Sequence, residues 1–263
     1  MTSSQSSPRP VALITGASMG IGLELARLAA ADGHDLVLVA RSEDRLATLA
    51  GELRASHGVN ATIVPADLTS PDAPAHVTDA IREAGLVVDV LVNCAGFGST
   101  GPYWRSELER ERGMIQVNVA ALAELTHRLV GGMVERRRGR VLNVASTAAF
   151  APGPNMATYY ATKAFVLSFT EAIAHELRGT GVTATALCPG PVATGFSKAA
   201  GNDQSILFKV GVDRPERVAA VGWKAMKRGR AVVVPGVSNK LAAFGVRFSP
   251  RAITRAVTAV LNS

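Results

Sequence analysis

The sequence predicts an α/β fold: one doubly wound domain with a seven-stranded parallel sheet flanked by helices. Apolar, β-branched runs alternate along the chain with segments of helical period, which favours parallel pairing through right-handed crossovers. The apolar runs are hydrophobic throughout rather than at every second residue, as expected for strands covered on both faces. Hydrophobic residues make up 48% of the chain and aromatics only 5%, so aliphatic side chains must build the core.

The elements follow one another without an interior linker rich in proline, glycine and serine, which predicts a single domain over residues 11–235 after a disordered segment 1–10. The expected strands are residues 11–15, 36–40, 61–64, 87–92, 140–145, 182–188 and 231–234. The expected helices are residues 21–32, 43–56, 72–84, 104–137, 157–178 and 214–228.

The charge of the chain is uneven. The formal net charge is +7, and residues 196–263 contain 12 basic and 3 acidic side chains. A basic quarter of this kind could attract an anionic partner such as nucleic acid. However, the chain has no zinc spacing, no RNA-binding aromatic signature and no basic helix joined to heptads. We therefore interpret the excess as a solvated basic face and expect no nucleic-acid partner.

Cysteine usage and the amino terminus predict a cytoplasmic protein. Cys94 and Cys188 both lie in apolar runs, which indicates buried thiols in a reducing compartment. The first ten residues lack the apolar stretch of a signal peptide, and no run reaches the roughly 18 apolar residues of a membrane-spanning helix. None of the five histidines lies in a motif, so no metal site is expected.

A glycine-rich turn follows the first expected strand. Glycine permits a tight turn and close approach of the backbone to a ligand, and the next helix directs its free N–H groups to the same place. A diphosphate is the natural occupant; a simple strand–helix turn is the alternative. The expected cofactor-binding residues of this turn are Gly16, Ser18, Met19, Gly20, Ile21 and Gly22.

The ends of the second and third strands suggest which dinucleotide binds. Arg41 and Ser42 stand where an acidic residue would bind the ribose 2′-hydroxyl of NAD, and a guanidinium pairs well with a 2′-phosphate. NADP(H) is therefore expected rather than NAD(H), unless Arg41 is an ordinary loop arginine. Asp67 could accept a hydrogen bond from the adenine amino group next to Leu68, or could simply cap its own turn.

Tyr159 and Lys163 are four residues apart in an expected helix, so their side chains lie on one face. A tyrosine with its ordinary pKa near 10 is a poor acid or base at neutral pH, and a nearby ammonium would lower that pKa. The pair is chemically suited to donate a proton to a carbonyl oxygen that receives hydride. Tyr160 is the competitor, but its partner four residues on is Ala164, which indicates packing.

Further polar residues stand at strand ends or in helices near this pair. Ser146 follows the fifth strand, where a hydroxyl could contact the substrate oxygen or merely cap a loop. Asn118 lies inside the long expected helix 104–137, where asparagine has poor propensity, so it either bridges a water to Lys163 or distorts the helix. The strand ends also supply the remaining expected cofactor contacts: Asn93, Ala95, Gly96, Pro189, Gly190, Val192 and Thr194.

With these motifs in order, the chain resembles the short-chain dehydrogenase/reductase family over residues 10–235. The resemblance implies a Rossmann-type fold, Tyr159 as acid/base, Lys163 on the nicotinamide ribose, Ser146 orienting the carbonyl and Asn118 in a water relay. It also implies a homodimer or homotetramer through helices 104–137 and 157–178. Two residues depart from the family pattern: Cys94 replaces an asparagine, and Met19 stands where some NADP-using members carry a basic residue.

These motifs predict an NADP(H)-dependent oxidoreductase that acts on a carbonyl or secondary alcohol. The alternative is a catalytically idle dinucleotide-binding sensor or scaffold, but such a protein could lose any of the four catalytic residues, all of which are present. The segment 195–213 is expected to form a substrate lid. The sequence does not identify the substrate.

Residues 236–263 form a basic, amphipathic extension. Its apolar side chains could lie on a membrane surface, or could pack on the domain or on a partner subunit. Pro250 interrupts any single long helix, which favours packing. We therefore expect the extension to dock on the protein and help wall a largely apolar substrate site.

Overall fold

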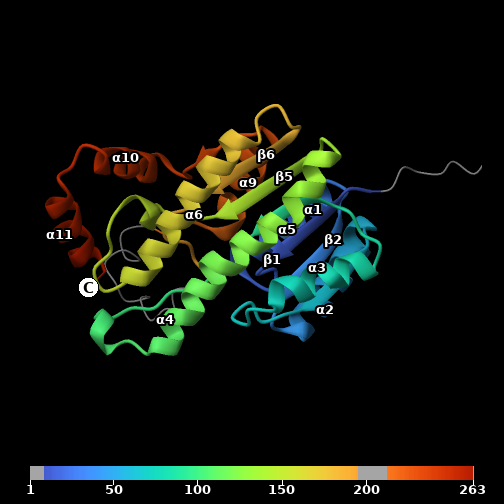
Figure 1. Ribbon diagram of the computed structural model, residues 1–263, viewed down its shortest axis with the longest axis horizontal. Coiled ribbons are helices and arrows are strands. Elements are labelled where there is room, and N and C mark those ends of the chain that lie inside the picture. The colour runs from blue at the N-terminus through green and yellow to red at the C-terminus, as the bar shows by residue number, and fades with distance from the viewer. Residues whose placement is uncertain (1–8, 195–211, 263) are drawn as a thin grey trace, which may run out of the picture.

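A computed structural model describes residues 9–194 and 212–262 of the chain. Seven parallel strands form one sheet in the order β3-β2-β1-β4-β5-β6-β7 (Figure 1), so the chain crosses over after β3 and winds both ways from β1. The predicted Rossmann-type fold class is therefore confirmed. The strands are β1 Val11–Thr15, β2 Asp35–Ala40, β3 Ala61–Pro65, β4 Val88–Asn93, β5 Gly139–Val144, β6 Val182–Leu187 and β7 Val232–Val233.

Helices cover both faces of the sheet. On one face, α1, α2 and α9 pack through residues such as Leu25, Leu46 and Trp223. On the other, α3, α5 and α6 pack through Val77, Leu125 and other aliphatic side chains. The helices are α1 Gly20–Ala31, α2 Glu43–His57, α3 Ala73–Glu83, α4 Leu108–Ile115, α5 Leu122–Glu135, α6 Ala157–Glu176, α9 Pro215–Lys227, α10 Val237–Val246 and α11 Arg251–Leu261.

The predicted continuous helix 104–137 is wrong. A 3₁₀ turn at Tyr103–Arg105 precedes α4, and a π-helical segment, Gln116–Ala121, joins α4 to α5. Asn118 sits in this segment and turns its side chain to the loop after β4, where its amide bonds both the N–H and the carbonyl of Phe97. These tertiary hydrogen bonds fix the register of the insertion, as π bulges at functional sites commonly require.

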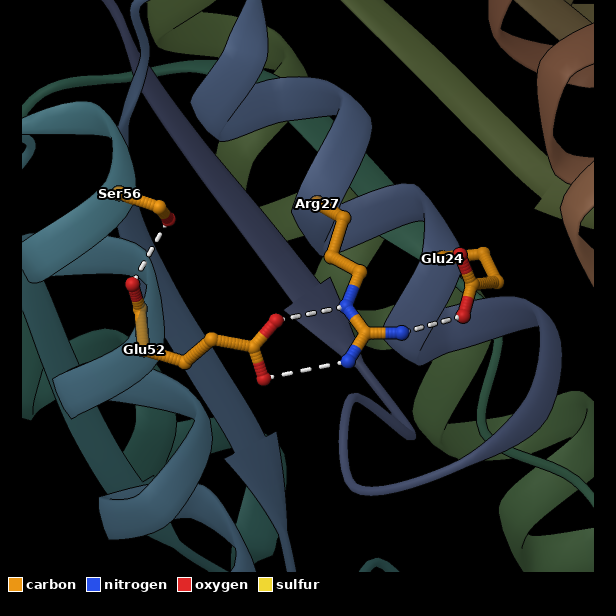
Figure 2. A network of polar contacts seen from close by, with 4 residues as sticks. All are labelled: Glu24, Arg27, Glu52 and Ser56. Carbon is orange, nitrogen blue, oxygen red and sulfur yellow. Dashed lines mark hydrogen bonds and ion pairs between the residues drawn. The ribbon is translucent and has the colours of Figure 1, made fainter.

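Ion pairs on the surface join neighbouring helices. Arg27 of α1 donates from Nε to Glu52 of α2 at 3.0 Å and from a second nitrogen to Glu24 of its own helix at 2.8 Å (Figure 2). Glu52 also accepts, through its backbone carbonyl, the hydroxyl of Ser56. This network lies on the surface of the α1–α2 layer, away from the carboxyl ends of the strands.

Two of the expected segments fall largely outside the description. Residues 1–8 of the expected disordered terminus and residues 195–211 of the expected lid are not among the described residues. Where the chain is described again, Asp213 pairs with Val192 in a short parallel bridge. None of the helices within residues 9–194 and 212–262 is long and apolar enough to cross a membrane.

Candidate active site

A cavity of about 810 Å³ lies at the carboxyl ends of the strands. The strands point toward the end of the molecule where α10 and α11 lie (Figure 1), and both helices contribute to the cavity wall. This is the edge at which doubly wound sheets bind ligands. Of the residues expected from the sequence, all line the cavity except Asn93 and Asn118.

The glycine-rich turn between β1 and α1 forms one wall of the cavity, in which three glycines expose backbone. Gly16 and Gly20 have φ values of 68° and 58°, a left-handed conformation that favours glycine. An added Cβ at Gly22 would lie 2.2 Å from the carbonyl oxygen of Gly16, and one at Gly16 would lie 2.9 Å from the nitrogen of Ala95. The turn therefore keeps its shape and fits against the end of β4 only if positions 16 and 22 carry no side chain.

The amino terminus of α1 is open to an anion. Its N-cap, Met19, makes no side-chain hydrogen bond, and the first turn holds no acidic residue. Free N–H groups at a helix amino terminus favour a phosphate. Across the cavity opening, Arg41 and Ser42 follow β2, and both line the cavity. The arrangement fits the diphosphate and the 2′-phosphorylated ribose of a dinucleotide.

Arg45 is a lining residue that the sequence analysis missed. It lies in the first turn of α2, whereas Arg41 precedes the N-cap Ser42, and both arginine side chains are exposed and line the cavity. A second basic residue four positions after Arg41 was the available signal in the sequence. Asp67 is the one acidic side chain among the described lining residues.

The side chain of Asp67 accepts hydrogen bonds from within its own turn. Its Oδ1 accepts hydrogen bonds from the N–H of Thr69 at 3.0 Å and from the Thr69 hydroxyl at 2.9 Å. The side chain is exposed and lines the cavity beside Leu68. Asp67 thus caps its own turn, which was the alternative to adenine binding. Both of these hydrogen bonds use Oδ1, and neither uses Oδ2.

Asn93 lies beneath the site rather than on it. Its Nδ2 donates to the hydroxyl of Thr126 at 3.1 Å and to Oδ1 of Asn143 at 2.9 Å, and it is fully covered. Asn143 in turn donates to Thr170 at 3.0 Å. This buried polar network joins β4 and β5 to α5 and α6. Asn93 therefore holds the strand end in place, while Ala95 and Gly96 form the surface.

Tyr159 and Lys163 lie in the first two turns of α6 and line the cavity together. Lys163 is buried, its Nζ donates to the carbonyl of Val144 at 2.8 Å, and the same atom lies 5.8 Å from the centre of the Tyr159 ring. A Cβ added at Gly96 would come within 2.9 Å of Asn118 Oδ1 and 3.5 Å of Lys163 Nζ. Glycine at position 96 thus leaves room for both polar groups.

Ser146 and Asn118 complete the expected constellation. The hydroxyl of Ser146 caps a 3₁₀ turn by accepting the N–H of Ala148 at 3.1 Å, and it lines the cavity. Asn118 is buried and donates from Nδ2 to the hydroxyl of Thr162 at 3.1 Å. Thr162 donates to the carbonyl of Tyr159 at 2.7 Å, so it links Asn118 to the catalytic turn.

Burial dominates the electrostatics of this pair. Burial raises the pKa of Tyr159 to about 12, while a hydrogen bond with Ser146 acts to lower it. Burial also lowers the pKa of Lys163 to about 8. The pKa of Tyr159 is thus raised rather than lowered as expected, because desolvation of the phenolate outweighs the favourable hydrogen bond with Ser146. Tyr159 therefore holds its proton at neutral pH.

The loop after β6 links the cofactor side to the carboxyl-terminal helices. The Thr194 methyl group would lie 2.9 Å from a Cβ added at Gly20, so this residue packs over the glycine-rich turn. A Cβ at Gly190 would meet the side chain of Asn239, 2.7 Å away. Asn239 belongs to α10 and lines the cavity, and the sequence analysis did not single it out.

α11 docks on the loop that precedes α6. Asn262 accepts the Tyr160 hydroxyl at 3.1 Å and donates to the Pro154 carbonyl at 3.0 Å. The hydroxyl of Thr258 donates to the Pro152 carbonyl at 2.6 Å. The polar side of α11 thus faces the protein, and Tyr160 anchors the last turn of the chain rather than facing the reacting groups.

The sequence profile described as short chain dehydrogenase matches residues 10–205. A putative ketoacyl reductase of Streptomyces coelicolor is 36% identical over 214 residues, which are 80% of this chain and 81% of that protein. A 7beta-hydroxysteroid dehydrogenase of Collinsella aerofaciens is 35% identical over 69% of this chain and 68% of its own length. The chain therefore belongs to the short-chain dehydrogenase/reductase family.

Other relatives match over less of their own length. A very-long-chain 3-oxoacyl-CoA reductase of Laccaria bicolor is 37% identical over 174 residues, which are 65% of this chain but only 52% of that protein. The chain thus spans about half the length of that relative.

Solved structures show the same fold with either cofactor. A short-chain dehydrogenase from Sphingobium yanoikuyae in complex with NADPH has a TM-score of 0.80 and 33% identity, covering 91% of this chain and 94% of that one. A short-chain dehydrogenase/reductase from Burkholderia phymatum in complex with NAD has a TM-score of 0.82 and 28% identity, covering 90% and 92%. The likeness establishes nicotinamide cofactor binding for this family fold without distinguishing the two cofactors.

Proposed function

We propose that this protein is an NADP(H)-dependent oxidoreductase that transfers hydride between nicotinamide and a carbonyl or secondary alcohol of an apolar substrate. The observation that carries the proposal is that Ser146, Tyr159 and Lys163 line one cavity together with the glycine-rich turn. When bound, the nicotinamide supplies or accepts the hydride. The side chains of this chain then have to orient the substrate oxygen and move one proton.

In the reductive direction, Tyr159 donates its phenol proton to the carbonyl oxygen. Its raised pKa keeps that proton in place at neutral pH, as a proton donor requires. Ser146 holds the same oxygen through its hydroxyl. Lys163 is anchored on the Val144 carbonyl, where its ammonium can bind the ribose hydroxyls, while Asn118 fixes the turn through Thr162 and the Phe97 backbone.

The preference for NADP(H) rests on the charge at the rim. Arg41 and Arg45 line the cavity where β2 ends, and their guanidinium groups suit a 2′-phosphate. The one acidic side chain among the described lining residues, Asp67, follows the neighbouring strand β3, and its Oδ1 is occupied by Thr69. The neutral 2′-hydroxyl of NAD(H) would leave this charge without a partner.

The apolar substrate is supported by the opposite wall. Phe150 and Met156 precede the catalytic turn, and α10 and α11 add aliphatic side chains without any charged residue among the described lining positions. The relatives named above act, by their names, on ketoacyl and hydroxysteroid compounds. Exposed apolar side chains on α4 and α6, Leu108, Ile115 and Phe165, support the expected homodimer or homotetramer.

The test is to follow NADPH absorbance while the protein meets a panel of 3-oxoacyl thioesters and fused-ring ketones. We expect turnover by the unaltered protein and a loss of about 10²–10⁴-fold in Tyr159→Phe, with NADPH affinity unchanged because only the proton is removed. Tyr160→Phe is the matched control and retains most of the activity. Turnover that survives in Tyr159→Phe would refute the assignment, and binding without turnover on any substrate would favour the idle sensor.

A further inference from the structure

α10 is apolar on two opposite faces, and only one of them belongs to the cavity. The inner face contributes Asn239, Ala242, Ala243 and Val246 to the cavity wall. The opposite face presents Val237, Leu241 and Phe244 at the spacing i, i+4 and i+7, and Phe248 follows in the turn after the helix, where its ring contacts that of Phe244. We call these four residues the outer stripe.

The outer stripe is open to solvent. In chain order, the four side chains are 72%, 67%, 60% and 74% exposed. The rings of Phe244 and Phe248 contact one another edge to face, with 5.0 Å between the ring centres. Single exposed apolar residues are ordinary on protein surfaces, but a row of four large ones marks an interaction site. The stripe points away from the cavity, so substrate does not cover it.

Basic side chains accompany the stripe, with no acid near them in the sequence. Lys240 and Arg247 belong to the same stretch of chain, and Arg251 and Arg255 lie on the adjoining α11. Residues 237–263 contain no aspartate or glutamate. No ion pair among the described residues involves any of these four, although surface ion pairs join basic side chains elsewhere on the molecule. Exposed apolar residues combined with unpaired cations are typical of helices that lie on lipid.

A second copy of the chain is a poor occupant of this surface. A two-fold interface centred on the stripe would bring the same four cations of each subunit together, with no carboxylate from this segment to separate them. A surface of phosphate head groups supplies the opposite charge, and the acyl region beneath it accepts the apolar side chains. We propose that the outer stripe docks the protein on an anionic lipid surface.

Docking by this helix would place the cavity wall near the lipid. The inner face of α10 lines the cavity and the outer face would contact the bilayer, so a single helix, about 10 Å across, separates the two. An apolar compound dissolved in the bilayer would then have a short path to the cavity. The docking itself does not depend on the proposed reaction, because it rests on the outer stripe and its cations.

The experiment is sedimentation of the full chain with vesicles of phosphatidylcholine alone or of phosphatidylcholine mixed with phosphatidylglycerol, at low and high salt. We expect binding to the anionic vesicles that weakens at high salt. The double variant Phe244→Ser/Phe248→Ser should lower the bound fraction at least about tenfold at limiting lipid. Lys240→Gln/Arg247→Gln should weaken the preference for anionic lipid, because only Arg251 and Arg255 of the four cations remain.

Control variants make similar apolar-to-serine and cation-to-glutamine changes before the amino ends of the strands. Val87→Ser removes an exposed apolar side chain before β4, and Arg228→Gln/Arg230→Gln removes two exposed cations before β7. These variants should bind vesicles as the unaltered protein does. Thermal unfolding checks that every variant is folded.

Three results would overturn the proposal: no binding to anionic vesicles, equal binding to neutral vesicles, or binding that the outer-stripe variants leave unchanged. A dimer that the stripe variants dissociate, with no vesicle binding, would assign the surface to a second copy instead.

Discussion

The two walls of the cavity are built by different means. On the side of β1 and β2, backbone forms the surface, and an added Cβ at Gly22 would come within 2.2 Å of a carbonyl oxygen. On the side of α10 and α11, side chains form it, and two of them, Ile253 and Val257, remain more than half exposed. A backbone wall admits almost no variation, whereas a wall of partly exposed aliphatic side chains can change one residue at a time.

This difference indicates which wall suits the dinucleotide and which suits the substrate. The dinucleotide keeps one shape in every reaction, so a rigid wall with fixed N–H groups suits it. The substrate differs between family members, so an adjustable wall suits it. Changes in the first wall should therefore affect cofactor binding, and changes in the second should affect substrate binding alone.

Gly22→Ala is the most severe test of the backbone wall. The new methyl group would collide with Gly16, so the turn must open, and we expect NADPH affinity to fall by at least about tenfold or the fold to be lost. Gly51→Ala is the matched control, because nothing lies within 4 Å of its Cβ position in α2. That change should stabilise the protein by up to about 1 kcal/mol. NADPH affinity within twofold of the original in Gly22→Ala would contradict the account.

Lys163→Met tests how much the buried ammonium lowers the free energy of unfolding. The folded-state pKa of about 8 lies below the ordinary 10.5, so protonation favours the unfolded chain. Lys163 therefore contributes a rise in the free energy of unfolding as the pH increases from 8 toward 10.5, against the opposite contribution of Cys94, Cys188 and Tyr159, whose pKa values burial raises to about 12. The methionine variant should lack the Lys163 contribution, so its stability should fall more steeply than that of the unaltered protein over this range, and it should melt at least about 2 °C higher at pH 7.

The measurement is thermal unfolding at pH 7 and pH 10, with the exposed Lys224→Met as control. Equal pH dependence in the Lys163 variant and the original would show that the lysine pays no desolvation penalty. Activity should be lost in the same variant, which would separate a role in the reaction from a role in stability.

Asn262→Ala tests the side-chain wall with a smaller expected effect. It removes the hydrogen bonds to Tyr160 and Pro154 that hold α11, at a cost of about 1–3 kcal/mol. We expect KM for a bulky ketone to rise severalfold while the NADPH dissociation constant stays the same. Asn60→Ala, which removes the side-chain hydrogen bond to Asp35 at the start of β2, should change neither. A weaker NADPH affinity in Asn262→Ala would show that the two walls are not independent.

The sequence predicted best what local chemistry decides. The predicted bounds of all seven strands agree with the structure within two residues at each end. Continuous aliphatic runs of this length are typical of parallel strands that are covered on both faces. The glycine-rich turn and the spacing of Tyr159 and Lys163 were equally clear, since each rests on one local geometry. Met19 and Cys94, the two residues that depart from the family pattern, line the cavity as expected. Met19 brings no basic group to it, and Cys94 brings no amide.

The sequence did not predict the features that depend on contacts between residues far apart in the chain. The π-helical segment depends on Asn118 reaching the backbone of Phe97, a contact that helical periodicity cannot reveal. The tyrosine pKa depends on burial, which is a property of the folded site. The covered position of Asn93 depends on its bonds to Thr126 and Asn143. The two faces of α10 could be separated only once its packing was known.

The central claim is that the backbone wall, with Arg41 at its rim, binds a 2′-phosphorylated dinucleotide, and the most direct measurement is a fluorescence titration with NADPH and NADH. The account predicts at least tenfold tighter binding of NADPH, about 1.4 kcal/mol, which Arg41→Ala reduces toward equality by weakening NADPH while leaving NADH unchanged. Equal affinities in the unaltered protein, or a preference that survives in both Arg41→Ala and Arg45→Ala, would contradict it.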